Sequence, residues 1–198
     1  MSELRDYPKI EFLSRQEIRA WLKVNHAKAT TFWLVTYKKH VPKHHIPYGD
    51  VVEELLCYGW IDSRTRRLDE DHMMLLVAPR KAGSTWSASN KKRVARLTKR
   101  GLMTKAGQDK IEAAKQDGSW TFLDEIENLV VPDDLSQAFN KNKRARENFS
   151  AFNASARKVI LLWIKTAKRD ETRLKRVSET VRLAAKNLKA AHPEARGR

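Results

Sequence analysis

The stretch that decides the fold runs from residue 48 to residue 90. It begins Tyr48-Gly-Asp-Val-Val-Glu-Glu-Leu-Leu-Cys-Tyr-Gly-Trp-Ile-Asp62 and ends Pro79-Arg-Lys-Ala-Gly-Ser-Thr-Trp-Ser-Ala-Ser-Asn90. Asp50-Val-Val-Glu53 is a helix-capping pattern, and apolar residues then recur at helical spacing, so a helix is predicted over 50–59. Gly59 can adopt the left-handed conformation that ends a helix.

Three runs of residues are predicted to form a small sheet. Residues 30–37 are rich in β-branched and aromatic side chains, which is the composition of a buried strand. Residues 61–68 and 72–79 read as two further short strands joined by a polar turn. Both faces of 72–79 are apolar, so this strand is expected to be central and covered by helices.

Capping residues mark two of the other predicted helices. Ser14 and Glu17 form a capping box that predicts a helix over 15–24. Ser87 is the expected N-cap of a helix over 88–100, which should pack on the sheet together with the 50–59 helix.

The last part of the chain shows apolar residues at helical spacing throughout, from about residue 141 onward. The predicted fold class is therefore α+β and predominantly helical, with a three-stranded sheet in the N-terminal half. The expected division is an α+β core domain over 1–135 and a C-terminal helical region over 136–198 packed on it.

The composition is that of a soluble globular protein, with 198 residues, 41% hydrophobic and 32% charged. No run approaches the roughly 18 apolar residues that a spanning helix needs, and the N-terminus lacks a signal-peptide pattern. The single cysteine excludes an intramolecular disulfide and suits a reducing compartment. These observations predict a cytoplasmic protein.

Positive charge is concentrated in two segments. The formal net charge is +16, of which residues 80–110 contribute +9 and residues 141–198 contribute +12, leaving −5 for the rest. A basic surface attracts polyanions such as nucleic acid, anionic headgroups or acidic proteins, without showing which.

The best candidate for a ligand site is the loop that precedes the 88–100 helix. It combines two cations, a glycine that allows close backbone approach, and the free N–H groups of a helix start, which together predict an anion site. Arg80 is expected to be solvated there, so that its loss costs at most about 1 kcal/mol. The alternative is an ordinary cap with a packed tryptophan. Trp60 and Asp62 are expected to shape the wall of this site. The full set of expected site residues is Trp60, Asp62, Arg80, Lys81, Ser84, Trp86 and Ser87.

Three further features of the sequence bear on possible chemistry. Asp62 either anchors the turn after the 50–59 helix or faces a ligand, and both remain open. Cys57 reads as a buried structural residue, because no histidine stands near it in sequence. The 38–47 loop contains His40, His44 and His45 but no cysteine or acid, so no metal site is predicted there. No cofactor and no catalytic residue is predicted for the chain.

The chain resembles the YdeI/OmpD-associated family, also called bacteriocin-protection proteins. The Leu56-Cys-Tyr-Gly-Trp-Ile-Asp62 run, the later Pro79-Arg and Trp86-Ser pairs, and the run from Ala167 to Arg176 carry that resemblance. Ser63, where many relatives have glycine, and the histidine-rich loop are departures. The resemblance implies a role in outer-membrane porin biology and in tolerance of bacteriocins or cationic antimicrobial peptides.

A stress-associated binding protein with an anion site is therefore the preferred prediction for function. No nucleophile, base or metal motif occurs at diagnostic spacing, so an enzyme of unknown reaction is the weaker alternative. The oligomeric state stays open. A second alternative is a nucleic-acid-binding protein that uses its basic helices, with the contacts predicted at Lys91, Lys92, Arg93, Arg173, Arg176, Arg182 and Lys186.

Overall fold

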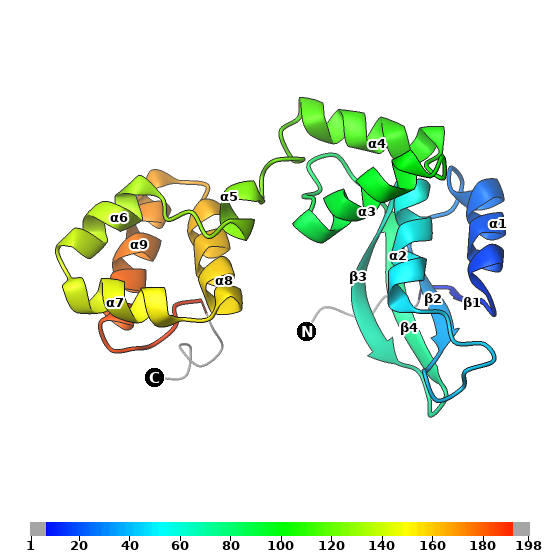
Figure 1. Ribbon diagram of the computed structural model, residues 1–198, viewed down its shortest axis with the longest axis horizontal. Helices are drawn as coiled ribbons and strands as arrows, with labels where there is room; N and C mark the ends of the chain where they lie inside the picture. The colour runs from blue at the N-terminus through cyan, green and yellow to red at the C-terminus, as the bar shows by residue number, and fades with distance from the viewer. Residues whose placement is uncertain (1–6, 192–198) are drawn as a thin grey trace. The chain divides into compact units, whose positions relative to one another are not determined.

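The computed structural model describes residues 7–191 and divides the chain into two compact units (Figure 1). Unit 1 comprises residues 1–121 and unit 2 comprises residues 122–198. The division falls earlier in the chain than the predicted boundary at residue 135. Packing of the C-terminal region on the core stays a prediction.

Unit 1 contains a four-stranded mixed sheet in the order β1-β2-β4-β3. The strands are β1 (Lys9–Glu11), β2 (Phe32–Tyr37), β3 (Trp60–Arg67) and β4 (His72–Pro79). β1 runs parallel to β2, whereas β2 and β3 both pair antiparallel with β4. The α+β class and the three predicted strands are confirmed, but the predicted strand number is wrong. The fourth strand, β1, is only three residues long, too short to show an alternating pattern.

The described residues of unit 1 form four helices, and capping explains where two of them begin. Helix α1 (Arg15–Asn25) starts where Ser14 Oγ accepts the N–H of Glu17 at 3.2 Å. Helix α3 (Ala88–Lys99) starts where Ser87 Oγ accepts the N–H of Asn90 at 3.2 Å. The remaining two are α2 (Tyr48–Cys57) and α4 (Lys105–Gln116).

The predicted cap of α2 is wrong. The helix begins at Tyr48 rather than Asp50, its N-cap is Pro47, and no side chain caps it. The Asp50 carboxylate instead accepts a hydrogen bond from Arg15 Nη1 at 2.9 Å. The Asp50 carboxylate, which the local pattern predicted to cap the helix, therefore forms a long-range ion pair with Arg15 instead.

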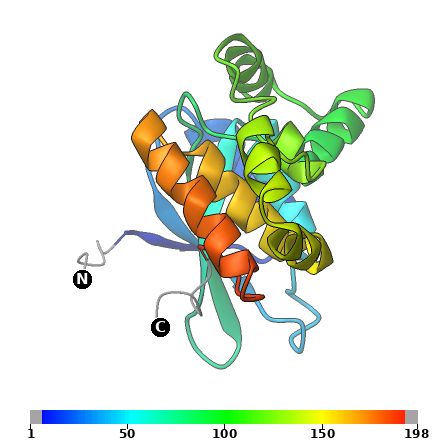
Figure 2. The same cartoon turned by 90° about the vertical axis from the view of Figure 1, so that its left-hand side faces the viewer.

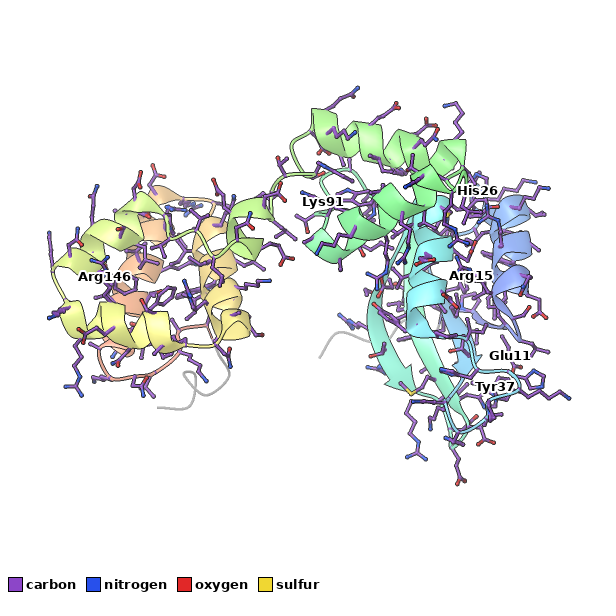
Figure 3. All side chains as sticks on the ribbon, viewed as in Figure 1. Glu11, Arg15, His26, Tyr37, Lys91 and Arg146 are labelled. Atoms are coloured by element: carbon purple, nitrogen blue, oxygen red, sulfur yellow. The ribbon has the colours of Figure 1, made fainter. Side chains whose placement is uncertain are left out.

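Ion pairs with α1 allow α2 to bury charged residues as well as apolar ones. Glu53 and Glu54 are only 5% and 2% exposed. Arg15, which Figure 3 shows between α1 and α2, donates Nη2 to Glu53 at 2.9 Å and Nε to Glu54 at 2.7 Å. Burial alone would raise the pKa of Glu53, but hydrogen bonds from Arg15 and Arg96 outweigh it and lower that pKa. Glu53 therefore stays charged inside the unit.

Close backbone contact joins α2 to α4. The hydroxyl of Thr104, the N-cap of α4, donates to the carbonyl oxygen of Cys57 at 2.6 Å. A Cβ atom on Gly107 would collide with the carbonyl oxygens of Cys57 and Leu56. Only glycine therefore fits at this point of α4, which holds the helix beside the residues that lead into the sheet.

Unit 2 is built from helices within its described residues. They are α5 (Asp124–Glu127), α6 (Asp133–Asn140), α7 (Lys143–Ala151), α8 (Ala154–Lys165) and α9 (Asp170–Ala184). Helix α9 contacts α6, α7 and α8, and Figure 2 shows it in orange beside α8. No described helix is both long enough and apolar enough to cross a membrane.

Candidate functional site

Arg80 is held at the point where the sheet ends and the loop to α3 begins. It follows β4 directly, and its backbone N–H donates to the carbonyl oxygen of Gly59 at 2.9 Å. Gly59 has φ 73° and a Cβ there would press on Ala106 in α4. The end of α2, the end of β4 and the start of α4 therefore meet around the backbone of Arg80.

The side chain of Arg80 is buried, which contradicts the expectation that it is solvated. The residue is 2% exposed, and its guanidinium carbon lies 3.8 Å from the centre of the Trp86 ring. Nη1 donates to the carbonyl oxygen of Thr85 at 3.0 Å. Trp86 is itself fully buried, and its ring centre lies 5.0 Å from that of Trp120. A cation is thus fixed in place by stacking inside unit 1.

Two nitrogens of this guanidinium have no hydrogen-bond partner among residues 7–191. Nε and Nη2 of Arg80 are buried without an acceptor, and so is Nε1 of Trp86. Buried polar groups are nearly always hydrogen-bonded, and an unpaired buried donor costs roughly 1–3 kcal/mol or more when charged. The unit therefore contains donors that lack an acceptor of their own.

Burial lowers the pKa of Arg80 to about 10, and the charge of Asp62 opposes that shift. The guanidinium is still protonated at neutral pH, so the group presented by the unit is a cation. No ion pair joins Arg80 to Asp62 or to any other carboxylate among the described residues.

In two other arginines of this chain, the nitrogens that are unpaired in Arg80, Nε and Nη2, bind a carboxylate. Arg173 uses Nε and Nη2 to bind both oxygens of Asp134, at 2.6 and 3.0 Å. Arg182 uses the same two nitrogens on Glu179, both at 2.7 Å. This side-on geometry matches a carboxylate or a phosphate. Arg80 has the same two donors, and no carboxylate of the described part of the chain binds them.

A small pocket of about 60 Å³ lies at Arg80. It is formed by the 80–86 loop on one side and by α4 with its C-terminal turn on the other. A volume near two waters, at about 30 Å³ each, admits the head of an oxyanion but not a whole metabolite. From the second side the pocket is lined by Lys110, Ala113, Ala114, Asp117 and Ser119.

The structure brings four of the predicted site residues together. Arg80, Lys81, Ser84 and Trp86 line the same pocket. Ser87 lies next to them in sequence, but its hydroxyl caps α3. The residues predicted for an anion site and the residue that forms the cap are thus neighbours in the chain.

The other two predicted residues face different partners. Trp60 Nε1 donates to the carbonyl oxygen of His26 at 3.2 Å, and its ring packs edge-on to Trp21 and Phe32. Asp62 accepts a hydrogen bond from the hydroxyl of Tyr48 at 2.6 Å. Neither residue lines the pocket, and Asp62 acts on Arg80 only through its charge.

The glycine of the loop is already in use. The N–H of Gly83, which has φ 72°, donates to Asp117 Oδ2 at 2.9 Å, and the N–H of Ser119 donates to Asp117 Oδ1 at 2.9 Å. The side chain and backbone of Ser119, together with Gly83, lower the pKa of Asp117. This carboxylate ties the 80–86 loop to the turn after α4, so the backbone of Gly83 holds the pocket's wall rather than a ligand.

Sequence reasoning missed the residues that come from α4 and its C-terminal turn. Asp117, Ser119 and Trp120 lie more than 30 residues after Arg80, and no spacing rule connects them to the loop. The one usable signal is Gly107, whose lack of a side chain brings α4 against α2. Such an approach becomes visible only when the fold is known.

The residues predicted for nucleic acid are largely occupied in unit 2. Arg173 and Arg182 are engaged by Asp134 and Glu179, and Arg176 donates to the carbonyl oxygen of Trp163. Lys186 follows the end of α9 and is exposed. In unit 1, the predicted cations Lys91, Lys92 and Arg93 lie on α3.

The histidines of the 38–47 loop have separate partners. His40 Nε2 lies 3.0 Å from Asp71 Oδ1, His44 packs against the Tyr37 ring at 5.3 Å, and His45 Nδ1 donates to the Tyr37 carbonyl oxygen at 2.8 Å. Among residues 7–191, no three His, Cys, Asp or Glu side chains are placed to hold a metal ion. Cys57 is fully buried, and burial raises the pKa of its thiol, the opposite of an activated nucleophile.

Two family models match different parts of the chain. Residues 10–110, about half of the chain, match the model described as Domain of unknown function (DUF8412). Residues 128–187 match the model described as Bacteriocin-protection, YdeI or OmpD-Associated. Searches of curated proteins and of solved structures found no match.

The second match confirms the family resemblance for the C-terminal part of the chain. It contains the run from Ala167 to Arg176 that carries the resemblance there. The 48–90 stretch, with its Cys57-Tyr-Gly-Trp-Ile-Asp62 run, lies in the first match instead. Most residues that line the Arg80 pocket therefore lie within the first match. The exceptions are Ala113, Ala114, Asp117 and Ser119.

Proposed function

The chain belongs to the family described as Domain of unknown function (DUF8412), and we propose a function for its unit 1. Unit 1 binds a small ligand through one carboxylate or phosphate group, which Arg80 holds. The family description names no activity, so the proposal rests on the chemistry of the site. One observation carries it: Arg80, a buried and charged residue that lines a pocket, has two guanidinium donors, Nε and Nη2, without a partner among the described residues.

A bound oxyanion would resolve the unfavourable state of Arg80. A cation taken out of water costs several kcal/mol unless it is paired. A carboxylate on the Nε and Nη2 edge supplies two charge-assisted hydrogen bonds of about 1.5–3 kcal/mol each. That sum corresponds to roughly millimolar affinity or somewhat tighter for the anionic head alone. The rest of the ligand, outside the pocket, would supply specificity.

The competing explanation is that ordered water fills the pocket and satisfies Arg80 permanently. Two water molecules would occupy about 60 Å³, which is the volume of the pocket. Water leaves the positive charge uncompensated, whereas an anion neutralises it. The two explanations therefore differ in whether anions raise the stability of the folded chain.

The wider physiological role is proposed from the second family match. The name of that family supports a link to bacteriocin protection. A binding role in tolerance of bacteriocins or cationic peptides is the proposal that we add to it. A cytoplasmic location belongs to the same proposal and is supported by the single free thiol, Cys57. The ligand bound at Arg80 would be the signal or metabolite that connects unit 1 to this role.

Thermal unfolding of the full chain in phosphate, malonate and chloride at matched ionic strength tests the proposed function. Phosphate and malonate should raise the unfolding temperature above its value in chloride, with saturation at high concentration. Arg80→Lys keeps the charge but removes the side-on pair of donors, so it should abolish the difference. Arg100→Lys, at an exposed arginine after α3, is the matched control and should leave it intact.

Equal stability in all three salts would overturn the proposal. A second variant guards against the case in which Arg80→Lys does not fold. Trp86→Phe keeps an aromatic ring under the guanidinium and removes the Nε1 donor together with part of the buried ring system. It should weaken the stabilisation by malonate without abolishing it.

A further inference from the structure

A second and separate pocket of about 330 Å³ lies in unit 1, on the sheet near the start of α2. Tyr37, which Figure 3 labels close to the 38–47 loop, is one of its lining residues. No residue is shared between this pocket and the one at Arg80. The apolar and aromatic lining residues are Leu34, Tyr37, Ile46, Tyr48, Val51, Met73, Met74 and Leu75.

The register of the sheet explains the floor of this pocket. Leu34 faces Leu75 across the β2–β4 pair, and Thr65 of β3 faces Leu75 from the other side. The next row places Thr36 opposite Met73. Helix α2 begins only at Tyr48, so it covers these rows incompletely and the 38–47 loop closes the remaining space.

The lining is apolar in its body and cationic at its edge. It includes Lys38, Lys39 and His45, and it contains no aspartate or glutamate. Lys38 Nζ donates to the carbonyl oxygens of Asp69 and Glu70, at 2.7 and 2.5 Å. Because His45 Nδ1 lies 2.8 Å from a carbonyl oxygen, which only accepts, that nitrogen carries the hydrogen. Lys39 is exposed beside them.

We propose that this pocket binds a small apolar molecule that carries one acidic group. The apolar body would lie on Leu34, Leu75 and Val51, and the acid would face Lys39 at the edge. A volume of 330 Å³ is near the lower end of the roughly 300–1,000 Å³ typical of ligand pockets, which favours an aromatic or short aliphatic acid over a long lipid chain. Met73 and Met74 are flexible enough to adapt to its shape.

Methyl NMR of the full chain, labelled at its four methionines, tests this proposal with cinnamate as the probe. Cinnamate should shift the methyl signals of Met73 and Met74 in a saturable way and leave Met103 unchanged. Cinnamyl alcohol, which has the same body without the charge, should bind about fivefold more weakly, as expected for one partly exposed charge interaction.

Two variants locate the site. Lys39→Glu should reverse the preference for the acid, whereas Lys43→Glu, an exposed lysine of the same loop outside the pocket, should preserve it. Thr65→Trp places a large ring into the pocket from the edge strand and should abolish the Met73 and Met74 shifts.

The proposal is overturned if cinnamate leaves Met73 and Met74 unshifted, if Thr65→Trp preserves the shifts, or if the alcohol binds as well as the acid. Arg80→Lys should leave cinnamate binding unchanged. The proposals for the Arg80 pocket and for this pocket are therefore tested independently of each other.

Discussion

The guanidinium of Arg80 lies 3.8 Å from the centre of the Trp86 ring, and two of its donors, Nε and Nη2, have no partner among residues 7–191, although Arg80 lines a pocket. Arginine stacked on an aromatic ring keeps its plane fixed, so the direction of its donors is fixed as well. The two residues therefore act together, with Trp86 orienting the group that Arg80 presents.

Replacing Arg80 by methionine should change stability by only about 1 kcal/mol while abolishing stabilisation by anions. The variant loses the bond to Thr85 and the stacking on Trp86, but it also removes an unpaired buried charge, and these effects oppose each other. Urea unfolding in chloride measures the difference. A loss above about 3 kcal/mol would identify Arg80 as a structural partner instead.

Gly107→Ala should destabilise unit 1 by at least about 2 kcal/mol, because the new Cβ meets the carbonyl oxygens of Cys57 and Leu56. Gly49→Ala is the matched control, since no atom lies within 4 Å of its Cβ position in α2. That change should be neutral or stabilising by up to about 1 kcal/mol. Similar effects of the two changes in urea unfolding would contradict the close α2–α4 contact.

Ser87→Ala should cost about 0.5–2 kcal/mol through loss of the cap on α3. The pocket at Arg80 should survive, because Ser87 does not line it. Chemical denaturation measures the first effect, and the malonate-dependent shift in unfolding temperature measures the second. Loss of the malonate effect in a well-folded Ser87→Ala protein would place the anion at the helix start rather than at Arg80.

His72 should make unit 1 more stable in mild acid than in mild base. Its hydrogen bond to Asp69 raises the pKa of His72, and the charges of Asp69, Glu11 and Asp71 act in the same direction. Because the folded pKa exceeds the unfolded value near 6.5, protonated His72 stabilises the fold below about pH 6.5. That contribution is lost as pH rises through the folded pKa.

Asp69→Asn should therefore destabilise the chain more at about pH 6 than at about pH 8. Denaturation at both pH values gives this difference, and an NMR titration of the His72 ring gives the pKa directly. An equal loss at the two pH values, or an unshifted His72, would refute the pairing.

Local patterns predicted the parts of the fold that depend on neighbours in sequence. The caps at Ser14 and Ser87 fixed the starts of α1 and α3, and β-branched composition located β2. Patterns failed where distant residues compete. Asp50 was predicted to cap α2 but pairs with Arg15 instead.

The candidate site follows the same division. The loop from Arg80 to Trp86 was predicted, because its cations, glycine and helix start stand together in the sequence. Its burial was not predicted, because the covering residues come from α4 and the turn after it. Trp60 and Asp62 were predicted to shape the wall of this site, yet strand β3 directs them to His26 and Tyr48.

The most direct test of the central claim is a proton–nitrogen correlation spectrum of the side-chain N–H groups of Arg80 and Trp86 during titration with malonate. The account predicts saturable shifts of the Arg80 Nε–H and Trp86 Nε1–H signals, because both donors lack a partner until the anion enters. Signals that stay in place while malonate reaches saturating levels for the thermal effect would contradict it.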